Sequence, residues 1–232
     1  MRSIRTTSSL QATFLNRTPF RSVVLDVDST LCGIEGIDWL AAHRGSDVAE
    51  RVALETAMAM RGEIRLESVY ANRLALVRPS REEIRALSEM YMSTVSPGAD
   101  EVIQRWIRDG MVVALMSGGI RQAILPLATK LGIAETNVHA VDLSFDSSGA
   151  YAGFDNTSPL STAVGKREIL ERVKLDRPML TVGDGSTDLV TRAVSDGFAA
   201  FTGYVARGPV MRNADVVVES FAQLESFVAN GL

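Results

Sequence analysis

Two kinds of hydrophobic segment alternate along most of the chain. Short continuous runs rich in β-branched residues are typical of strands buried on both faces of a parallel sheet, whereas apolar residues three or four positions apart indicate helices. The runs cover residues 22–27, 111–116, 178–182, 197–201 and 215–218, and helical spacing is clear over residues 100–109, 121–131 and 166–174. Strands and helices in this order predict a doubly wound, Rossmann-like α/β core around a parallel sheet.

The alternation is interrupted between residues 31 and 96, where the pattern is helical throughout. Candidate helices cover residues 36–44, 47–60, 66–77 and 81–92, separated in part by a break at Gly62 and a start signal at Pro79-Ser80. We interpret residues 34–95 as a small helical-bundle cap inserted after the first strand. The core then consists of residues 22–33 and 96–232, and hinges are expected near residues 32–33 and 96–98.

Two further segments depart from the alternating pattern. Residues 140–145 and 150–154 flank the turn sequence Asp146-Ser147-Ser148-Gly149, which predicts a β-hairpin. Residues 1–21 carry four arginines and many Ser and Thr, and no acidic residue precedes Asp26. This composition fits a weak organellar transit peptide or a plain N-terminal extension. We favour the extension, and therefore a cytoplasmic protein.

The composition is that of an ordinary globular protein. Of 232 residues, 46% are hydrophobic and 22% are charged, which argues against a disordered chain. The net charge of −4 argues against a nucleic-acid partner, because binding a phosphate backbone needs clustered Lys and Arg. Since no apolar run approaches the roughly 20 residues that cross a bilayer, we expect no membrane partner either. Monomer and homodimer both remain open.

Cysteine and histidine are too scarce for several kinds of site. Cys32 is the single cysteine, so there is no intrachain disulfide, and its expected role is that of a small buried hydrophobe rather than a reactive thiol. With two histidines, His43 and His139, a Cys/His zinc site and a Ser-His-Asp triad are both improbable.

The first two predicted strands end in residues that could meet one ligand. Asp26 and Asp28 follow the first strand, and Ser117-Gly118-Gly119 follows the second. Ligands of open α/β sheets bind at the carboxyl ends of the strands. Two acids could share a polar site, although exposed loop acids are common. A hydroxyl before two glycines could expose backbone N–H groups to an anion, or could form a plain tight turn.

Two later elements add a cation and more acids. Lys166 follows Gly165 at the start of a predicted helix, where it could reach a phosphate or simply lie in solvent. Gly183-Asp184-Gly185-Ser186-Thr187-Asp188 follows the third core strand. Acids among glycines at a strand end suit a hard divalent cation, although Asp-Gly sequences also form ordinary turns. Together the elements supply a carboxylate nucleophile, a second acid, phosphate donors and metal ligands, which is the inventory for phosphoryl transfer through an aspartyl-phosphate.

The chain resembles the phosphoserine phosphatase subgroup of the haloacid-dehalogenase superfamily from about residue 22 to about residue 220. The motifs already described are those of the superfamily. The subgroup features are Glu35-Gly36-Ile37-Asp38, Ala59-Met60-Arg61-Gly62-Glu63, Arg73-Leu74-Ala75-Leu76 and Tyr151-Ala152-Gly153-Phe154-Asp155. The chain departs from the family pattern at Leu66, at Ile120 and at Val141-Asp142-Leu143. These departures spare the phosphoryl chemistry and weaken the substrate assignment, because packing within the cap shapes the pocket.

The resemblance implies a role for each residue of the reaction centre. Asp26 would be the nucleophile and Asp28 the general acid and base. Mg²⁺ would bind the Asp26 carboxylate, the Asp28 backbone carbonyl and Asp184, with Asp188 holding water or the surrounding geometry. The transferring phosphoryl group would contact Ser117, the Gly118 amide, Lys166 and Thr187. Glu35 would pair with a substrate ammonium and Arg73 with a substrate carboxylate, beside Met60 in the cap.

The resemblance therefore implies a Mg²⁺-dependent phosphatase that converts O-phosphoserine to serine, the last step of serine biosynthesis. A phosphatase or phosphotransferase for another small phosphomonoester, such as phosphohomoserine or phosphothreonine, is the alternative. A non-enzymatic phospho-acceptor domain is a third possibility, but it would need neither Asp28 nor a helical cap.

Overall fold

A computed structural model of the protein describes residues 19–60, 64 and 66–230. The predicted N-terminal extension therefore lies almost wholly outside the described residues. The same holds for the break at Gly62 and for part of the motif at residues 59–63. No helix in the described ranges is long and apolar enough to span a membrane.

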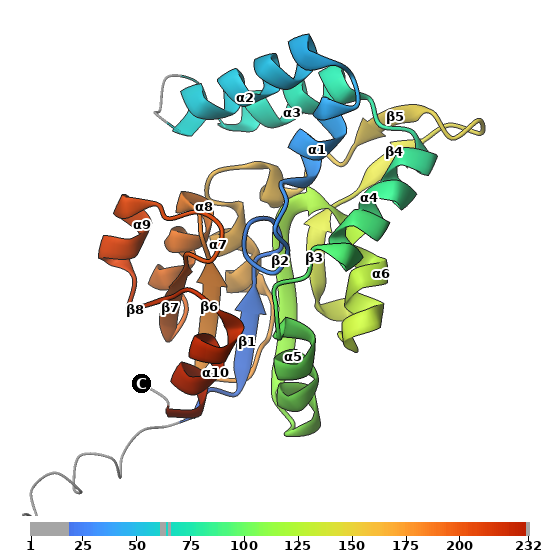
Figure 1. Ribbon diagram of the computed structural model, residues 1–232. Coiled ribbons are helices and arrows are strands. Elements are labelled where there is room, and N and C mark those ends of the chain that lie inside the picture. The colour runs from blue at the N-terminus through green and yellow to red at the C-terminus, as the bar shows by residue number, and fades with distance from the viewer. Residues whose placement is uncertain (1–18, 61–63, 65, 231–232) are drawn as a thin grey trace, which may run out of the picture.

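The centre of the described structure is a parallel sheet (Figure 1). Its strands, in spatial order, are β3 (Val138–Val141), β2 (Val112–Ile120), β1 (Ser22–Leu25), β6 (Met179–Gly183), β7 (Gly197–Phe201) and β8 (Val216–Val218). Every residue of β1, β6 and β7 is buried, as expected of strands covered on both faces. The prediction of a doubly wound α/β core is confirmed.

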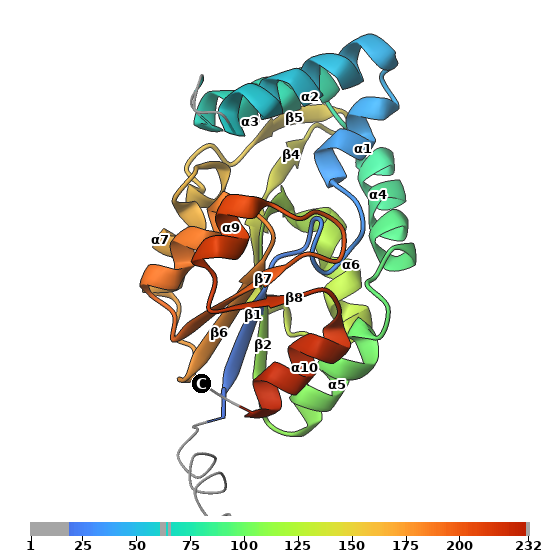
Figure 2. The ribbon, with the colours of Figure 1, turned by 60° about the vertical axis from the view of Figure 1, so that its left-hand side comes forward.

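Helices cover both faces of this sheet, as the two views show (Figures 1 and 2). One face carries α5 (Ala99–Arg108), α6 (Arg121–Leu131) and α10 (Phe221–Asn230). The other carries α7 (Gly165–Arg172), α8 (Ser186–Leu189) and α9 (Gly208–Asn213), with α8 in contact with both of the others. The strand order reverses between β1 and β6, and in sheets of this kind the ligand site lies at the carboxyl ends of the strands beside that reversal.

The segment between β1 and β2 is helical, as its sequence pattern predicts. It contains α1 (Gly36–Ala42), α2 (Ser46–Met60), α3 (Leu66–Val77) and α4 (Arg81–Ser93). Helices α1, α2 and α3 pack on one another above the carboxyl ends of the strands (Figure 1). Helix α4 instead descends beside the core and packs against α6. The division of the chain into a core and a cap remains a prediction.

The predicted β-hairpin is present but shorter than expected. Its arms are β4 (Leu143–Phe145) and β5 (Tyr151–Phe154), which pair antiparallel. The first arm was expected to begin at residue 140, and this is wrong because residues 138–141 form β3, an edge strand of the main sheet. Asp142 lies between β3 and β4 and belongs to neither, although the sequence pattern reads as one segment. Strand β2 also continues four residues beyond its predicted end, through Ser117-Gly118-Gly119 to Ile120.

Short 3-10 helices complete the described chain. They are η1 (Glu135–Asn137), η2 (Pro159–Ser161) and η3 (Val190–Ala193). Helix η2 matters for the site because it passes close to the start of α7. A Cβ atom on Gly165 would lie 1.7 Å from the Pro159 carbonyl oxygen, so glycine is required for this close approach.

Candidate active site

A tight loop after β1 brings Asp26 and Asp28 to one cavity. The Asp26 amide still donates to the Val182 carbonyl at 3.0 Å, which continues the pairing with β6. The chain then turns back, and the Cys32 amide donates to the Val27 carbonyl at 2.9 Å. Ser29 at the turn has a φ of 53°, a conformation that non-glycine residues adopt mainly at constrained sites. Both aspartates therefore line the cavity at the carboxyl end of the sheet.

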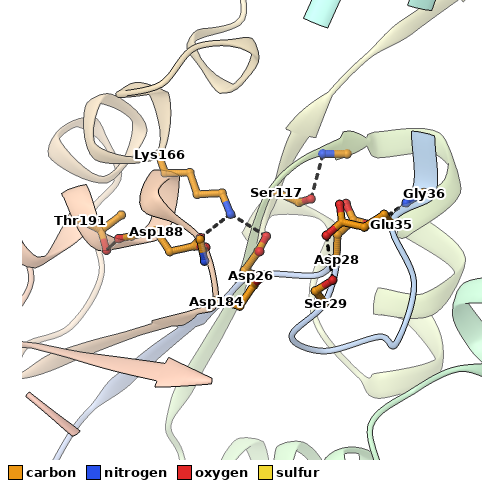
Figure 3. A network of polar contacts seen from close by, with 12 residues as sticks. Asp26, Asp28, Ser29, Glu35, Gly36, Ser117, Lys166, Asp184, Asp188 and Thr191 are labelled. Carbon is orange, nitrogen blue, oxygen red and sulfur yellow. Dashed lines mark hydrogen bonds and ion pairs between the residues drawn. The ribbon is translucent and has the colours of Figure 1, made fainter. Parts of the chain in front are cut away.

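Lys166 places a buried ammonium group between two of the acids (Figure 3). Its Nζ lies 2.6 Å from Asp26 Oδ1 and 2.5 Å from Asp188 Oδ1, and the side chain is about 7% exposed. Burial alone would lower the pKa of Lys166, but the carboxylates of Asp188 and Asp26 outweigh it and hold the pKa above its usual value. The lysine is therefore charged and available to an anion in the cavity.

Three buried carboxylates gather beside this lysine. Oxygen atoms of Asp26, Asp184 and Asp188 all lie within 4.8 Å of one another. Burial, followed by the charge of Asp188, raises the pKa of Asp184 to about 7 and also raises that of Asp26 well above its usual range. Repulsion of this kind is what a bound cation relieves, and carboxylate oxygens are the ligands that Mg²⁺ prefers. The donor set fits a hard divalent cation.

Asp188 and Asp184 differ in how their oxygens are engaged. Asp188 Oδ1 accepts from Lys166, and its Oδ2 accepts from the Gly185 amide at 2.9 Å. Asp184 Oδ2 is fully buried, accepts no hydrogen bond from the described residues and has one ion-pair partner, Arg207 at 3.0 Å. Asp184 therefore has the freer oxygens for a metal ion, while Asp188 is already held by protein donors.

Asp28 is held by donors from the helical insertion. Its Oδ1 accepts from the Gly36 amide at 2.9 Å and from the Tyr91 hydroxyl at 2.7 Å. Burial raises the pKa of Asp28, while the hydrogen bond from Tyr91 acts to lower it. Tyr91 lies on α4 and is fully buried.

The phosphate-binding residues expected from the sequence line the same cavity. Ser117 Oγ accepts from the Gly119 amide at 2.9 Å, which fixes the hydroxyl near the end of β2, within the strand. A Cβ atom on Gly118 would lie 3.3 Å from the Leu160 carbonyl, so this stretch of backbone runs close to η2. Thr187, on α8, also lines the cavity. Hydroxyl and amide donors therefore surround the space next to Lys166.

The insertion contributes Glu35 and Arg73 to the lining of the same cavity. Glu35 accepts a hydrogen bond from the Ser29 hydroxyl at 2.7 Å. Burial raises the pKa of Glu35, and the charge of Asp28 raises it further. The Arg73 guanidinium forms an ion pair with Asp38, while its Nε is buried without a hydrogen-bond partner among the described residues. An acid and a cation thus face the space next to the reaction centre.

One cavity therefore contains nearly every residue that the sequence singled out. Its lining includes Asp26, Asp28, Glu35, Arg73, Ser117, Gly118, Lys166, Asp184, Thr187 and Asp188. Met60 ends α2, and its side chain lies outside the described part of the structure. Cys32 is fully buried, and burial raises the pKa of its thiol, which fits the expected small hydrophobe.

Several lining residues carried no sequence signal. Arg207, directly before α9, lies 3.0 Å from Asp184 and 3.9 Å from Glu35. Tyr70, on α3, presents a buried hydroxyl with no hydrogen-bond partner in the described structure. Both residues stand in segments without a recognisable motif, and only the packing of the insertion and of the loop after β7 brings them to the site.

Comparisons with known proteins agree with this geometry. The chain is 37% identical over 206 residues to a phosphoserine phosphatase of Bos taurus, covering 88% of this chain and 91% of the relative. It is 38% identical over 208 residues to a chloroplastic phosphoserine phosphatase of Arabidopsis thaliana, covering 88% and 70%. No family model matches the chain.

A solved structure shares the fold of this chain at a lower sequence identity. It is a phosphoserine phosphatase that holds an analogue of the phospho-aspartyl intermediate, and it superposes with a TM-score of 0.73 at 26% identity. The match covers 90% of this chain and 99% of that one, so the likeness includes both the sheet and the inserted helices.

Proposed function

Since the chain belongs to the phosphoserine phosphatase family, with the haloacid-dehalogenase fold, and is a phosphatase, we propose that it hydrolyses O-phosphoserine to serine with Mg²⁺. One observation carries the proposal. Asp26 lies 2.6 Å from Lys166 in a cavity that Glu35 and Arg73 also line. The reaction centre and the complementary charges for an amino acid therefore share one space.

In the first half of the reaction, an Asp26 carboxylate oxygen attacks phosphorus. The new oxygen–phosphorus bond forms as the bond to the serine oxygen breaks, and Asp28 gives its proton to that oxygen. Ser117, the Gly118 amide, Lys166 and Thr187 bind the phosphoryl oxygens, whose negative charge they stabilise. In the second half, Asp28 takes a proton from water, the water oxygen bonds to phosphorus, and Asp26 is released with inorganic phosphate.

Asp26, Asp184 and the Asp28 backbone carbonyl would hold the metal ion. When bound, Mg²⁺ reduces the repulsion between an anionic nucleophile and an anionic phosphate. Asp188 has both oxygens engaged by Lys166 and Gly185, which supports a role in holding the lysine and the surrounding geometry.

Glu35 and Arg73 provide the selectivity in this proposal. A carboxylate favours a substrate that brings an ammonium group, and a guanidinium binds a carboxylate through paired hydrogen bonds. Among the described residues the Nε of Arg73 has no hydrogen-bond partner, which leaves donor capacity for such a contact. Met60 belongs to the same proposal as a neighbour of the substrate, on the strength of the family resemblance.

The inserted residues 34–95 are proposed to act as a cap that closes over the substrate and excludes bulk water. The two connections to the core lie side by side, since the Gly33 amide donates to the Thr94 carbonyl at 2.9 Å and the Ser96 amide to the Leu31 carbonyl at 2.8 Å. Hinges near residues 32–33 and 96–98 would therefore move as a paired unit.

Phosphate release with Mg²⁺ tests the substrate. We expect a clear preference for phosphoserine over phosphothreonine, phosphohomoserine, phosphoethanolamine and sugar phosphates. Arg73→Ala should lower kcat/KM for phosphoserine but leave kcat/KM for phosphoethanolamine, which lacks a carboxylate, unchanged. Arg78→Ala is the matched control on the same segment. Equal rates on sugar phosphates would instead favour a phosphatase or phosphotransferase for another phosphomonoester.

A second experiment tests the nucleophile. Asp26→Asn should abolish turnover. It should also abolish the mass increase of one phosphoryl group that is expected of the wild-type protein when its reaction with phosphoserine is quenched in acid, because an amide cannot form the acyl phosphate. Near-normal turnover by this variant would contradict the assignment.

A further inference from the structure

The carboxylate of Asp28 is held from one side. Oδ1 accepts both hydrogen bonds, from the Gly36 amide at 2.9 Å and the Tyr91 hydroxyl at 2.7 Å. Oδ2 receives no hydrogen bond from the described residues. It lies beside Gly119, where an added Cβ atom would be 3.0 Å from it, and Gly119 lines the cavity. The two oxygens of this carboxylate therefore face different surroundings.

Tyr91 is rigidly placed to make its hydrogen bond. Its side chain is fully buried, and α4 packs against α6 of the core. Gly36 leaves the room that the hydroxyl fills, since a Cβ atom there would lie 2.1 Å from the Tyr91 oxygen. A tyrosine hydroxyl, whose ordinary pKa is about 10, keeps its proton at neutral pH and therefore acts as the donor of this hydrogen bond.

We propose that Tyr91 is a positioning residue, which holds Asp28 Oδ1 against the protein so that Oδ2 points into the cavity toward the leaving oxygen of the substrate. This inference rests on the proposed function, in which Asp28 protonates that oxygen. The Gly36 amide alone gives the carboxylate one anchor, about which the group can rotate. The Tyr91 hydroxyl is the second anchor and fixes the direction of Oδ2. Because both anchors come from the insertion, the orientation of the acid depends on how α1 and α4 pack.

Leaving groups of different basicity separate positioning from plain stability. The serine alkoxide must be protonated as it departs, whereas the phenolate of p-nitrophenyl phosphate leaves readily without a proton. The ratio kcat/KM reports steps up to departure of the leaving group. For Tyr91→Phe we expect kcat/KM to fall about tenfold on phosphoserine, a fraction of what general acid catalysis contributes. On p-nitrophenyl phosphate we expect a loss below about threefold.

Tyr151→Phe is the matched control, because it removes a tyrosine hydroxyl on β5 outside the cavity and should leave both ratios unchanged. Thermal melting checks that each variant is folded. Should Tyr91→Phe fail to fold, Gly36→Ala serves instead, since its methyl group must displace the same hydroxyl, and the same selective loss is expected. In folded Tyr91→Phe protein, an unchanged kcat/KM on phosphoserine, or an equal loss of kcat/KM on both substrates, would overturn the role of Tyr91. Failure of the wild-type protein to hydrolyse phosphoserine would instead overturn the proposed function.

Discussion

At the scale of single residues, the buried charge of Lys166 joins two acids that would otherwise repel each other. Lys166→Met removes the ammonium group from between Asp26 and Asp188 and leaves their carboxylates without that counter-charge. In the proposed mechanism the variant also lacks a donor to the phosphoryl oxygens. We expect phosphate release at saturating Mg²⁺ to fall at least about 100-fold, the usual effect of removing such a donor.

Arg167→Met controls for the loss of a neighbouring positive charge. Arg167 is exposed and pairs with Glu171 one turn along α7, away from the cavity. Its replacement should change turnover by less than about twofold, since exposed pairs of this kind contribute little. Comparable losses in the two variants would show that Lys166 has no special place in the reaction.

Residues at strand ends were predictable, because the carboxyl ends of parallel strands meet at one edge of a sheet. This reasoning brought together Asp26, Ser117 and Asp184 from segments far apart in the sequence. Tyr91 and Arg207 were not predictable in the same way. Each lies in a helix or loop whose sequence is ordinary, and its place at the site depends on side-chain packing that no local pattern encodes.

At the scale of elements, the helix that carries Tyr91, α4, is stabilised at its start by side-chain capping. Its first turn has a capping box, in which Ser80 Oγ accepts from the Glu83 amide at 3.2 Å and Glu83 Oε2 accepts from the Ser80 amide at 2.7 Å. Ser80→Ala removes the first of these bonds. We expect the free energy of unfolding, measured by urea denaturation, to fall by about 1 kcal/mol.

Ser93→Ala is the matched control at the other end of α4. Its exposed hydroxyl donates back to the Met90 carbonyl at 2.9 Å and caps no amide, so the expected change is below about 0.5 kcal/mol. Equal effects of the two substitutions would contradict the importance of the box.

The Arg44 side chain also binds Glu83 and lowers the pKa of Glu83 to about 2. The stability that this pair contributes is therefore present above about pH 4.5 and is lost as the pH falls toward 2.

Most elements were predictable from hydrophobic spacing, and the exceptions have physical causes. Helices α3 (Leu66–Val77) and α6 (Arg121–Leu131) have the bounds that the sequence predicts. Strand β3 was merged with the hairpin, since apolar residues stand on both sides of Asp142, the residue that separates the two strands. Strand β2 was cut short at Ser117-Gly118-Gly119, where glycines suggest a turn although the backbone stays extended and Ile120 pairs again with Val141.

At the scale of the whole molecule, alternating strands and helices were enough to predict the core, because short crossovers between parallel strands allow few topologies. The placement of the insertion was harder to predict. Helices α1, α2 and α3 cover the carboxyl ends of the strands, whereas α4 packs beside the core on α6. A helical pattern shows that each helix has an apolar face, but it does not say which neighbour that face meets.

The buried acids make the stability of the metal-free protein depend on pH. Burial and the charge of Asp188 raise the pKa of Asp184 from 3.8 to about 7, so the folded protein binds this proton more tightly than the unfolded chain. The associated stability is present below about pH 4 and is lost as the pH rises through 7. We expect the free energy of unfolding with EDTA to fall by about 3 kcal/mol between pH 5 and 8. Added Mg²⁺ should restore more stability at pH 8 than at pH 5, because in the proposed metal site it would bind the ionised carboxylates. Urea denaturation at several pH values measures both effects, and Asp184→Asn should flatten them. If the metal-free protein were more stable at pH 8 than at pH 5, this would show that burial does not raise the pKa of these carboxyl groups in the folded state.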